Sequence, residues 1–192
     1  TSHGLSRPSY IHRSKEPYSV DEFENVNPTM LVDGEPVPMD NFSYFQAWHL
    51  PSRGFISFVT RYKDPADRTL FFMTSQDGVA WSEWTRLAAI DKGHYQISIH
   101  SDTKCCTAFN YHPEPNGLNY RTNLYYLETM DFGESWQNAG GETVDIPVTT
   151  PDNNALVYDY AAEGLKVYLK DIRLDPDNNP VILYVVSKGY ES

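Results

Sequence analysis

Two short motifs that recur along the chain restrict its fold more than any other feature. One begins at Ser75 and ends at Trp81, and the other begins at Thr129 and ends at Trp136. Each contains a hydroxyl residue, an Asp, a Gly and a Trp in that order. An Asp carboxylate can accept hydrogen bonds from turn N–H groups, Gly permits a positive φ, and Trp can bury its ring. Each motif therefore predicts a tight turn that closes over a buried indole.

The two copies of the motif differ in length by one residue. Asp77 stands four positions before Trp81, whereas Asp131 stands five positions before Trp136. We expect all the motif residues to be structural and to carry no chemistry. They are Ser75, Asp77, Gly78 and Trp81 in the first copy and Thr129, Asp131, Gly133 and Trp136 in the second.

The spacing of strand-like runs predicts an all-β fold of the β-propeller type. The third strand of each repeat is expected to end near Ser14, Ser75, Thr129 and Ser187, with spacings of 75 − 14 = 61, 129 − 75 = 54 and 187 − 129 = 58 residues. A repeat of this length with four antiparallel strands is typical of a propeller blade. The alternative is a β-sandwich or barrel in which the two motifs recur by chance.

The predicted blade count suggests a part of a larger assembly. A propeller closes with roughly four to eight blades, and 192 residues at this period hold about three. An open piece would expose apolar sheet faces, which is an aggregation hazard. We therefore expect the remaining blades to come from a longer chain or from another copy.

Within this scheme, some segments have a predicted place. Residues 42–49, 95–100 and 155–158 are expected to be the innermost strands, which line the central channel of a propeller. Residues 20–26 predict a brief helix or an edge strand. Residues 27–41 contain three prolines and a glycine and are predicted to be a connector.

Composition and charge limit the possible partners. Aromatic residues make up 14% of the chain, and Pro plus Gly number 13 + 11 = 24, which suits many short strands joined by turns. The net charge of −11 argues against non-specific binding to nucleic acid or to anionic membranes. No apolar run reaches the roughly 18 residues of a transmembrane helix. A local cluster of basic residues could still bind an anionic sugar.

The two cysteines are neighbours in a strand-like run. Cys105 and Cys106 should point to opposite faces of a sheet, which predicts one buried thiol and one on the other face. A strained vicinal disulfide is the alternative. Neither arrangement provides a disulfide framework or a zinc site.

Residues 77–81 and 131–136 resemble the Asp-boxes of BNR-repeat proteins, which are sialidase-like β-propellers with blades of four antiparallel strands. Other stretches are similar to a bacterial family of BNR-repeat proteins related to seven-bladed ulvan lyases and to rhamnose–glucuronate-cleaving enzymes. The likeness covers most of the 192 residues and implies about three blades of an expected seven. The further stretches are residues 41–44, 58–61, 92–95, 110–113 and 187–191.

The resemblance implies cleavage of an acidic, uronate-containing polysaccharide by β-elimination or hydrolysis. Elimination needs a cation to neutralise the carboxylate, a base to take the adjacent C–H proton and an acid for the leaving oxygen. Arg suits the first role through its bidentate fork, and His or Tyr can fill the others. By resemblance, Tyr44 is the catalytic tyrosine and Arg61 neutralises the carboxylate. The base in the related enzymes is a His from an earlier blade, for which His94 is the substitute candidate here.

Four further residues are candidates for substrate binding. Tyr95 and Tyr158 belong to predicted innermost strands, and His112 and Arg121 flank the polar loop 113–120. Structural alternatives stand beside these roles, since strand tyrosines are often packed aromatics and the loop can simply be solvated.

Two alternatives also stand beside the assigned chemistry. Arg61 could pair with Asp64 or Asp67 instead of with a substrate. His94, His100 and His112 are too scattered to define a metal site, so we expect no metal and no cofactor, while a structural ion elsewhere stays open.

Two other functions compete with polysaccharide cleavage. A non-catalytic carbohydrate-binding or scaffolding propeller would need only exposed aromatic and polar side chains. A sialidase-like glycoside hydrolase would need an Arg triad and a Phe/Tyr-Arg-Ile-Pro motif, which residues 6–8, Ser-Arg-Pro, do not match. No leader peptide is visible, but the chain does not begin with Met, so a removed leader and a secreted or periplasmic location are expected.

Overall fold

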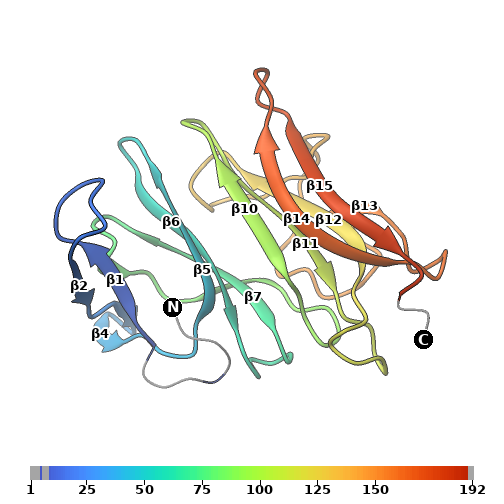
Figure 1. Cartoon of the computed structure of the whole chain (residues 1–192), viewed down its shortest axis with the longest axis horizontal. Helices are drawn as coiled ribbons and strands as arrows, with labels where there is room; N and C mark the ends of the chain where they lie inside the picture. Colours follow the sequence, from blue (N-terminus) through green and yellow to red (C-terminus); the bar gives the residue numbers. More distant parts are fainter. Residues whose placement is uncertain (1–4, 6–8, 190–192) are drawn as a thin grey trace.

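The computed structural model describes Leu5 and residues 9–189, and every regular element in this part of the chain is a β-strand. The sheets stand side by side in chain order, from β1 at one side to β15 at the other (Figure 1). The all-β prediction is confirmed. Residues 6–8, which were compared with the sialidase motif, and residues 190–191 of the last resemblance stretch lie outside the described residues.

The first blade is a set of four antiparallel strands within a larger sheet that also includes β8 (Ala80–Trp81), β3 (Thr29–Val32) and β4 (Glu35–Pro38). It comprises β5 (Ser43–Leu50), β6 (Gly54–Arg61), β7 (Thr69–Ser75) and β9 (Thr85–Ala88), paired in that order. Both faces of β6 and β7 are buried, because neighbouring sheets cover both sides. This burial explains their nearly continuous apolar sequences.

The second blade repeats the first. It comprises β10 (Gln96–His100), β11 (Cys105–Tyr111), β12 (Thr122–Thr129) and β13 (Leu156–Tyr158), again antiparallel and in chain order. All residues of β11 and β12 are buried. The two blades therefore have the same topology, with β10 at one edge and β13 at the other.

A two-stranded sheet flanks the blades at each side. β1 (Ile11–Ser14) pairs with β2 (Phe23–Val26), and β14 (Lys166–Leu174) pairs with β15 (Pro180–Ser187). Residues 20–26 thus contain an edge strand rather than a helix.

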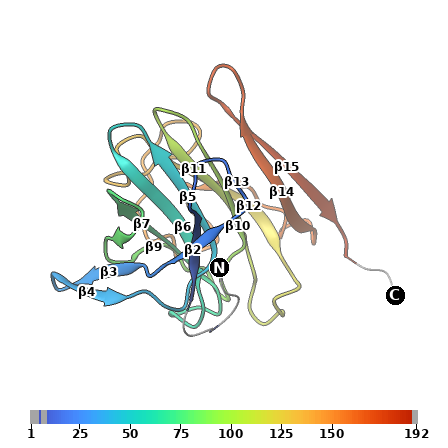
Figure 2. The same cartoon turned by 60° about the vertical axis from the view of Figure 1, so that its left-hand side comes forward.

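A second hairpin occupies the predicted connector. β3 (Thr29–Val32) and β4 (Glu35–Pro38) extend away from the body (Figure 2). β3 also joins the short β8 (Ala80–Trp81) in parallel. The prediction that residues 27–41 are only a connector is wrong, because Pro28 precedes β3 and the other two prolines lie in the edge strand β4, where a missing N–H is tolerated.

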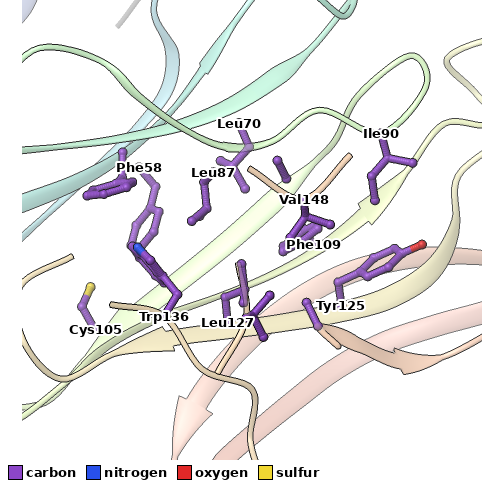
Figure 3. Packing of buried hydrophobic residues seen from close by; sticks show 14 of the residues in the cluster. Phe58, Leu70, Leu87, Ile90, Cys105, Phe109, Tyr125, Leu127, Trp136 and Val148 are labelled. Atoms are coloured by element: carbon purple, nitrogen blue, oxygen red, sulfur yellow. The ribbon is translucent and has the colours of Figure 1, made fainter. Parts of the chain in front are cut away.

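Three apolar clusters hold the sheets face to face. The largest lies between the two blades, where Trp136 packs against Phe58 and Phe72 at ring-centroid distances of 6.1 and 5.0 Å (Figure 3). A second cluster lies on the other face of the first blade, and a third lies between the second blade and β14–β15. Both cysteines are buried free thiols: Cys105 belongs to the first cluster and Cys106 to the third, so they point to opposite faces.

The two turn motifs form closed hydrogen-bonded turns. Asp77 Oδ1 accepts hydrogen bonds from the backbone N–H groups of Val79 and Ala80, both at 2.8 Å. In the second turn, Asp131 Oδ1 accepts one from the N–H of Ser135 at 2.9 Å. Gly133 has a φ of 96°, and a Cβ there would overlap the ring of Phe72. Trp81 and Trp136 are both buried, so each turn fastens one indole into a core.

The structure corrects the predicted order of strands near the C-terminus. Residues 155–158 were predicted to be an innermost strand, but β13 is the last strand of the second blade and pairs with β12. β14 takes the innermost place and contacts β10. Consequently Ser187 ends the second strand of its sheet rather than the third. A short apolar run reads the same at either edge of a blade, so sequence periodicity did not separate the two positions.

Candidate functional site

The innermost strands bring their first residues to one edge of the molecule. Gln96 Nε2 donates to the Tyr44 carbonyl at 3.4 Å, and further along both strands Trp48 Nε1 donates to Ser98 Oγ at 2.7 Å. The contact that lies later on β5 also lies later on β10, so the two strands run in the same direction. At the same edge, the N–H of Val167 donates to the Arg121 carbonyl at 2.8 Å, which anchors the start of β14.

Tyr95 is the centre of a cluster at this edge. Its ring lies 5.6 Å from that of Tyr44 and 5.3 Å from that of His112, both close to edge-on. The guanidinium carbons of Arg68 and Arg121 lie 4.5 and 4.1 Å from the same ring centroid. Three of the four predicted substrate-binding residues, together with Tyr44, therefore meet at one place.

Arg68 and Arg121 have no carboxylate partner in the described part of the chain. Nε of both side chains and Nη1 of Arg68 are buried without a hydrogen-bond acceptor among these residues. Stacking on an aromatic face recovers about 0.5–2 kcal/mol per cation. Burying a guanidinium without a counter-ion costs more than that, so two positive charges here favour an anion.

The blade repeat itself produces this pair of arginines. Arg68 directly precedes β7 and Arg121 directly precedes β12, and each is followed by a Thr. They stand 75 − 68 = 7 and 129 − 121 = 8 residues before the two turn motifs. Sequence reasoning missed Arg68, although aligning the two motifs would have found an Arg at the same place in both repeats.

A network of backbone hydrogen bonds holds Arg68 in position. Its N–H donates to the Lys92 carbonyl at 3.1 Å, and its carbonyl accepts from the N–H of His94 at 2.8 Å. Gly93, between them, has a φ of 97° and touches the Arg68 backbone so closely that a Cβ would overlap the carbonyl oxygen. Only glycine fits this approach of two loops.

We expect Gly93→Ala to destabilise the fold and to displace Arg68. A positive φ alone costs a residue with a Cβ about 1–2 kcal/mol, and the overlap adds to it. The free energy of unfolding, measured with urea, should therefore fall by at least about 1–2 kcal/mol. The matched control is Gly117→Ala in the exposed loop, where φ is not positive and a Cβ has open space. Equal stability of the two variants would contradict this account.

His112 lies beneath Tyr95 and is fully buried. One ring nitrogen, Nδ1, donates to the Gly93 carbonyl at 2.8 Å, and the other, Nε2, is buried. Burial, together with the charges of Arg68 and Arg121, lowers the pKa of His112 to about 4. The imidazole is therefore neutral at pH 7, and it packs against the Tyr95 ring.

Tyr44 adds a hydroxyl to the cluster. Its φ of 52° lies in the left-handed region, at an irregularity in the pairing of β5 with β6. Burial, with side-chain hydrogen bonds to Tyr62 and Tyr95, raises the pKa of Tyr44 above its ordinary value. The hydroxyl therefore stays protonated at neutral pH and suits a proton donor better than a base.

His94, the predicted base, points into the core. Nε2 accepts a hydrogen bond from the N–H of Ile90 at 3.0 Å, and Nδ1 donates to the Asn110 carbonyl at 2.9 Å. The side chain is fully buried against Phe109, so both ring nitrogens serve the fold. This environment gives no support to a catalytic role, which stays a prediction.

The buried His94 predicts a loss of stability in acid. Burial lowers its pKa from 6.5 to about 3, so the unfolded chain binds the proton more tightly than the folded one. Its stabilising contribution is complete above about pH 6.5 and is lost as the pH falls towards the folded pKa of about 3. The slope for one group reaches at most about 1.4 kcal/mol per pH unit.

We expect His94→Gln to flatten this pH dependence. A Gln amide can accept from Ile90 and donate to Asn110 without titrating. Urea unfolding between pH 4 and pH 7 measures the slope, and His49→Gln, at an exposed position of β5, is the control. An unchanged slope in His94→Gln would contradict the assignment.

The resemblance assigns Arg61 to the substrate carboxylate, but in the structure its guanidinium makes other contacts. Nε donates to Asp64 at 2.7 Å and Nη1 to the Asp40 carbonyl at 3.0 Å. The guanidinium also covers the ring of Trp84 at 4.5 Å. Arg61 thus pairs with Asp64, as the structural alternative has it, and no described contact joins it to the Tyr95 cluster.

Tyr158 is also separate from the cluster. It lies on the outer strand β13, where its hydroxyl donates to Glu163 at 2.5 Å and its ring stacks near Tyr160 at 4.5 Å. Its substrate-binding role stays a prediction. No group of three or more His, Cys, Asp or Glu side chains in the described residues could hold a metal ion. The same residues include no helix long and apolar enough to cross a membrane.

The comparisons with known proteins agree with this architecture. A family model described as "BNR repeat-containing family member" matches residues 1–191. The chain belongs to this family. No curated protein matches it.

Solved structures show what fold this BNR-repeat protein has. It is similar to an ulvan lyase of polysaccharide lyase family PL25, solved alone and bound to -[GlcA(1-4)Rha3S]-, with a TM-score of 0.65 and 16% identity in both cases. Each match covers 90% of this chain and 41% of the lyase chain. The likeness establishes propeller-type blades, and this chain spans less than half the length of the lyase.

Proposed function

We propose that this BNR-repeat protein is part of a carbohydrate-active propeller that binds and cleaves a uronate-containing polysaccharide by β-elimination. The observation that carries the proposal is the pair Arg68 and Arg121, two cations without a carboxylate partner in the described residues, stacked on one Tyr ring. Such a pair fits a planar carboxylate through bidentate hydrogen bonds. The likeness to an ulvan lyase supports the same substrate class.

The proposed reaction assigns a role to each group at this edge. Arg68 and Arg121 neutralise the uronate carboxylate, which makes the adjacent C5–H more acidic. A base removes that proton, the C5–H electron pair forms the C4=C5 double bond, and the C4–O bond breaks. Tyr44 then gives its proton to the departing oxygen. In this scheme Arg121 and Arg68 take the role that the resemblance assigns to Arg61.

The base comes from outside the described residues in this proposal. His94 and His112 are both fully buried, and neither ring nitrogen reaches the surface at Tyr95. The lyase with the same fold is more than twice as long as this chain, so further blades can contribute a side chain to the same mouth.

An incubation of the full-length protein, with all of its blades, with ulvan tests this function. Release of unsaturated uronate, followed by its ultraviolet absorbance, is the expected result, and carboxyl-reduced ulvan is the control that should remain uncut. Absence of unsaturated product with retained binding would replace the lyase by the second candidate. Absence of both binding and cleavage would overturn the proposal.

The second candidate is a carbohydrate-binding propeller without catalysis. It is favoured by one observation, the burial of both histidines near the site. A binding module needs the Arg pair and the aromatic rings but no base. Equal affinity for intact ulvan before and after long incubation, with no shortening of the chains, would identify it.

We further propose that other blades cover the faces at the ends of this segment. On β15 the side chains of Val181, Leu183 and Val185 are 55%, 62% and 47% exposed, whereas Ile182 and Tyr184 pack into the third cluster. An apolar row on each face is typical of a strand buried on both sides. The rest of a longer chain or another copy would supply the cover, and a secreted or periplasmic location would give access to polysaccharide.

A further inference from the structure

A cavity lies beside the Tyr95 cluster. It has a volume of about 450 Å³ and lies between the loop that precedes β12 and the start of β14. This size lies within the range of small-molecule sites. Its lining residues are Asn116, Gly117, Asn119, Tyr120, Arg121, Lys166 and Tyr168.

Two cations border this cavity, and its lining includes no carboxylate. Lys166 Nζ lies 5.1 Å from the Tyr120 ring, and the Arg121 guanidinium lies 4.9 Å from the Tyr168 ring. No ion pair in the described residues involves either cation. On a chain of net charge −11, a basic cavity of this kind attracts anions locally.

The cavity also has the neutral groups that bind a sugar ring. Tyr120 presents an aromatic surface, and Asn116 and Asn119 add side-chain amides at its rim. The Tyr168 hydroxyl donates to the Asn119 carbonyl at 3.2 Å, which ties the loop to β14. Gly189 lies against Lys166, where a Cβ would overlap the Lys166 side chain, so the glycine leaves room for the ammonium.

Arg121 connects the two places. Its guanidinium carbon lies 4.1 Å from the Tyr95 ring and 4.9 Å from the Tyr168 ring, so one side chain borders both. We propose that the cavity is a second oxyanion subsite, in which Lys166 holds the carboxylate or sulfate ester of the sugar unit next to the one bound at Tyr95. This inference rests on the proposed binding of an acidic polysaccharide. It adds that the ligand must carry an anionic group on each of two neighbouring sugar units.

The test compares short and long ulvan oligosaccharides. Calorimetric titration of the full chain should give tighter binding of a tetrasaccharide than of a disaccharide. Lys166→Met should lower the tetrasaccharide affinity by about tenfold and leave the disaccharide affinity unchanged. Lys170→Met is the matched control, because it removes the same charge from the same strand outside this cavity.

Two modified ligands distinguish the sources of the anion. Loss of the Lys166 effect with desulfated tetrasaccharide identifies a sulfate ester, and its loss with carboxyl-reduced tetrasaccharide identifies a carboxylate. Equal tetrasaccharide affinities for Lys166→Met and Lys170→Met would overturn the subsite while leaving the proposed function intact. Absence of wild-type binding to either oligosaccharide would overturn both.

Discussion

Replacing either stacked arginine, as Arg68→Met or Arg121→Met, is expected to weaken binding of ulvan oligosaccharides by about tenfold to 100-fold. Each change removes charge-assisted hydrogen bonds to the sugar carboxylate, worth about 1.5–3 kcal/mol per bond. Because both cations share the Tyr95 ring, their effects should not be additive in the double variant. Calorimetric titration and the rate of product release measure the loss.

The stability of these variants should distinguish a binding role from a structural one. Arg68 is only 9% exposed and lacks a counter-ion among the described residues. Removing an unpaired, buried charge relieves desolvation, so the Arg68→Met protein should unfold at an unchanged or higher temperature.

Arg61→Met is the matched control for this pair. Arg61 has its ion pair with Asp64 and its contact with Trp84, so this variant should lose stability by about 1 kcal/mol and keep its affinity. If Arg61→Met lost affinity and Arg68→Met lost only stability, the roles assigned to the two arginines would be reversed.

Trp136→Ala is expected to reduce the free energy of unfolding by about 3–5 kcal/mol. The indole is 3% exposed and fills the space between the two blades, against Phe58 and Phe72. Its removal leaves a cavity in the largest apolar cluster, since strands on both sides are held by their own sheets. Urea unfolding followed by far-ultraviolet circular dichroism measures the change.

Trp136→Phe is the control for that cavity. Phenylalanine keeps an aromatic ring at the interface and removes the indole N–H, which has no acceptor among the described residues. Because it leaves a smaller cavity, its cost should stay well below that of Trp136→Ala. Equal destabilisation by the two changes would show that the turn, rather than the packing between blades, depends on this residue.

The sequence was informative wherever one side chain has one local task. Asp131, Gly133 and Trp136 act within a single turn, so their order in the chain already described their roles. The places of strands within a blade were harder to predict, because a short run such as β13 fits either edge and only its pairing with β12 places it.

The candidate site was likewise predicted only in part. Tyr44, Tyr95, His112 and Arg121 were separate candidates for the site, and ring and cation contacts join all four. Arg68 stands at the same place in its repeat as Arg121, so an alignment of the two turn motifs would have identified it.

Burial decided the roles that sequence reasoning left ambiguous. His94 and His112 both precede or follow apolar runs, and the sequence does not show that both rings turn inward. A side chain's direction depends on the neighbours that fill the space around it, and for His94 these lie in the loop that precedes it and on β11. Arg61 likewise pairs with Asp64 and covers the ring of Trp84, contacts that the sequence offered only as an alternative or did not show.

The sequence by itself determined the all-β class and the two turns, because these depend on contacts between residues close in the chain. Only the tertiary structure decided which arginines lack partners, which histidines are buried and which strand lines the inner edge. Those properties arise where Arg68, Tyr95, Arg121 and Tyr168 meet from separate strands and loops. Long-range packing sets the charge balance of that edge, and the proposal of an anionic ligand rests on this balance.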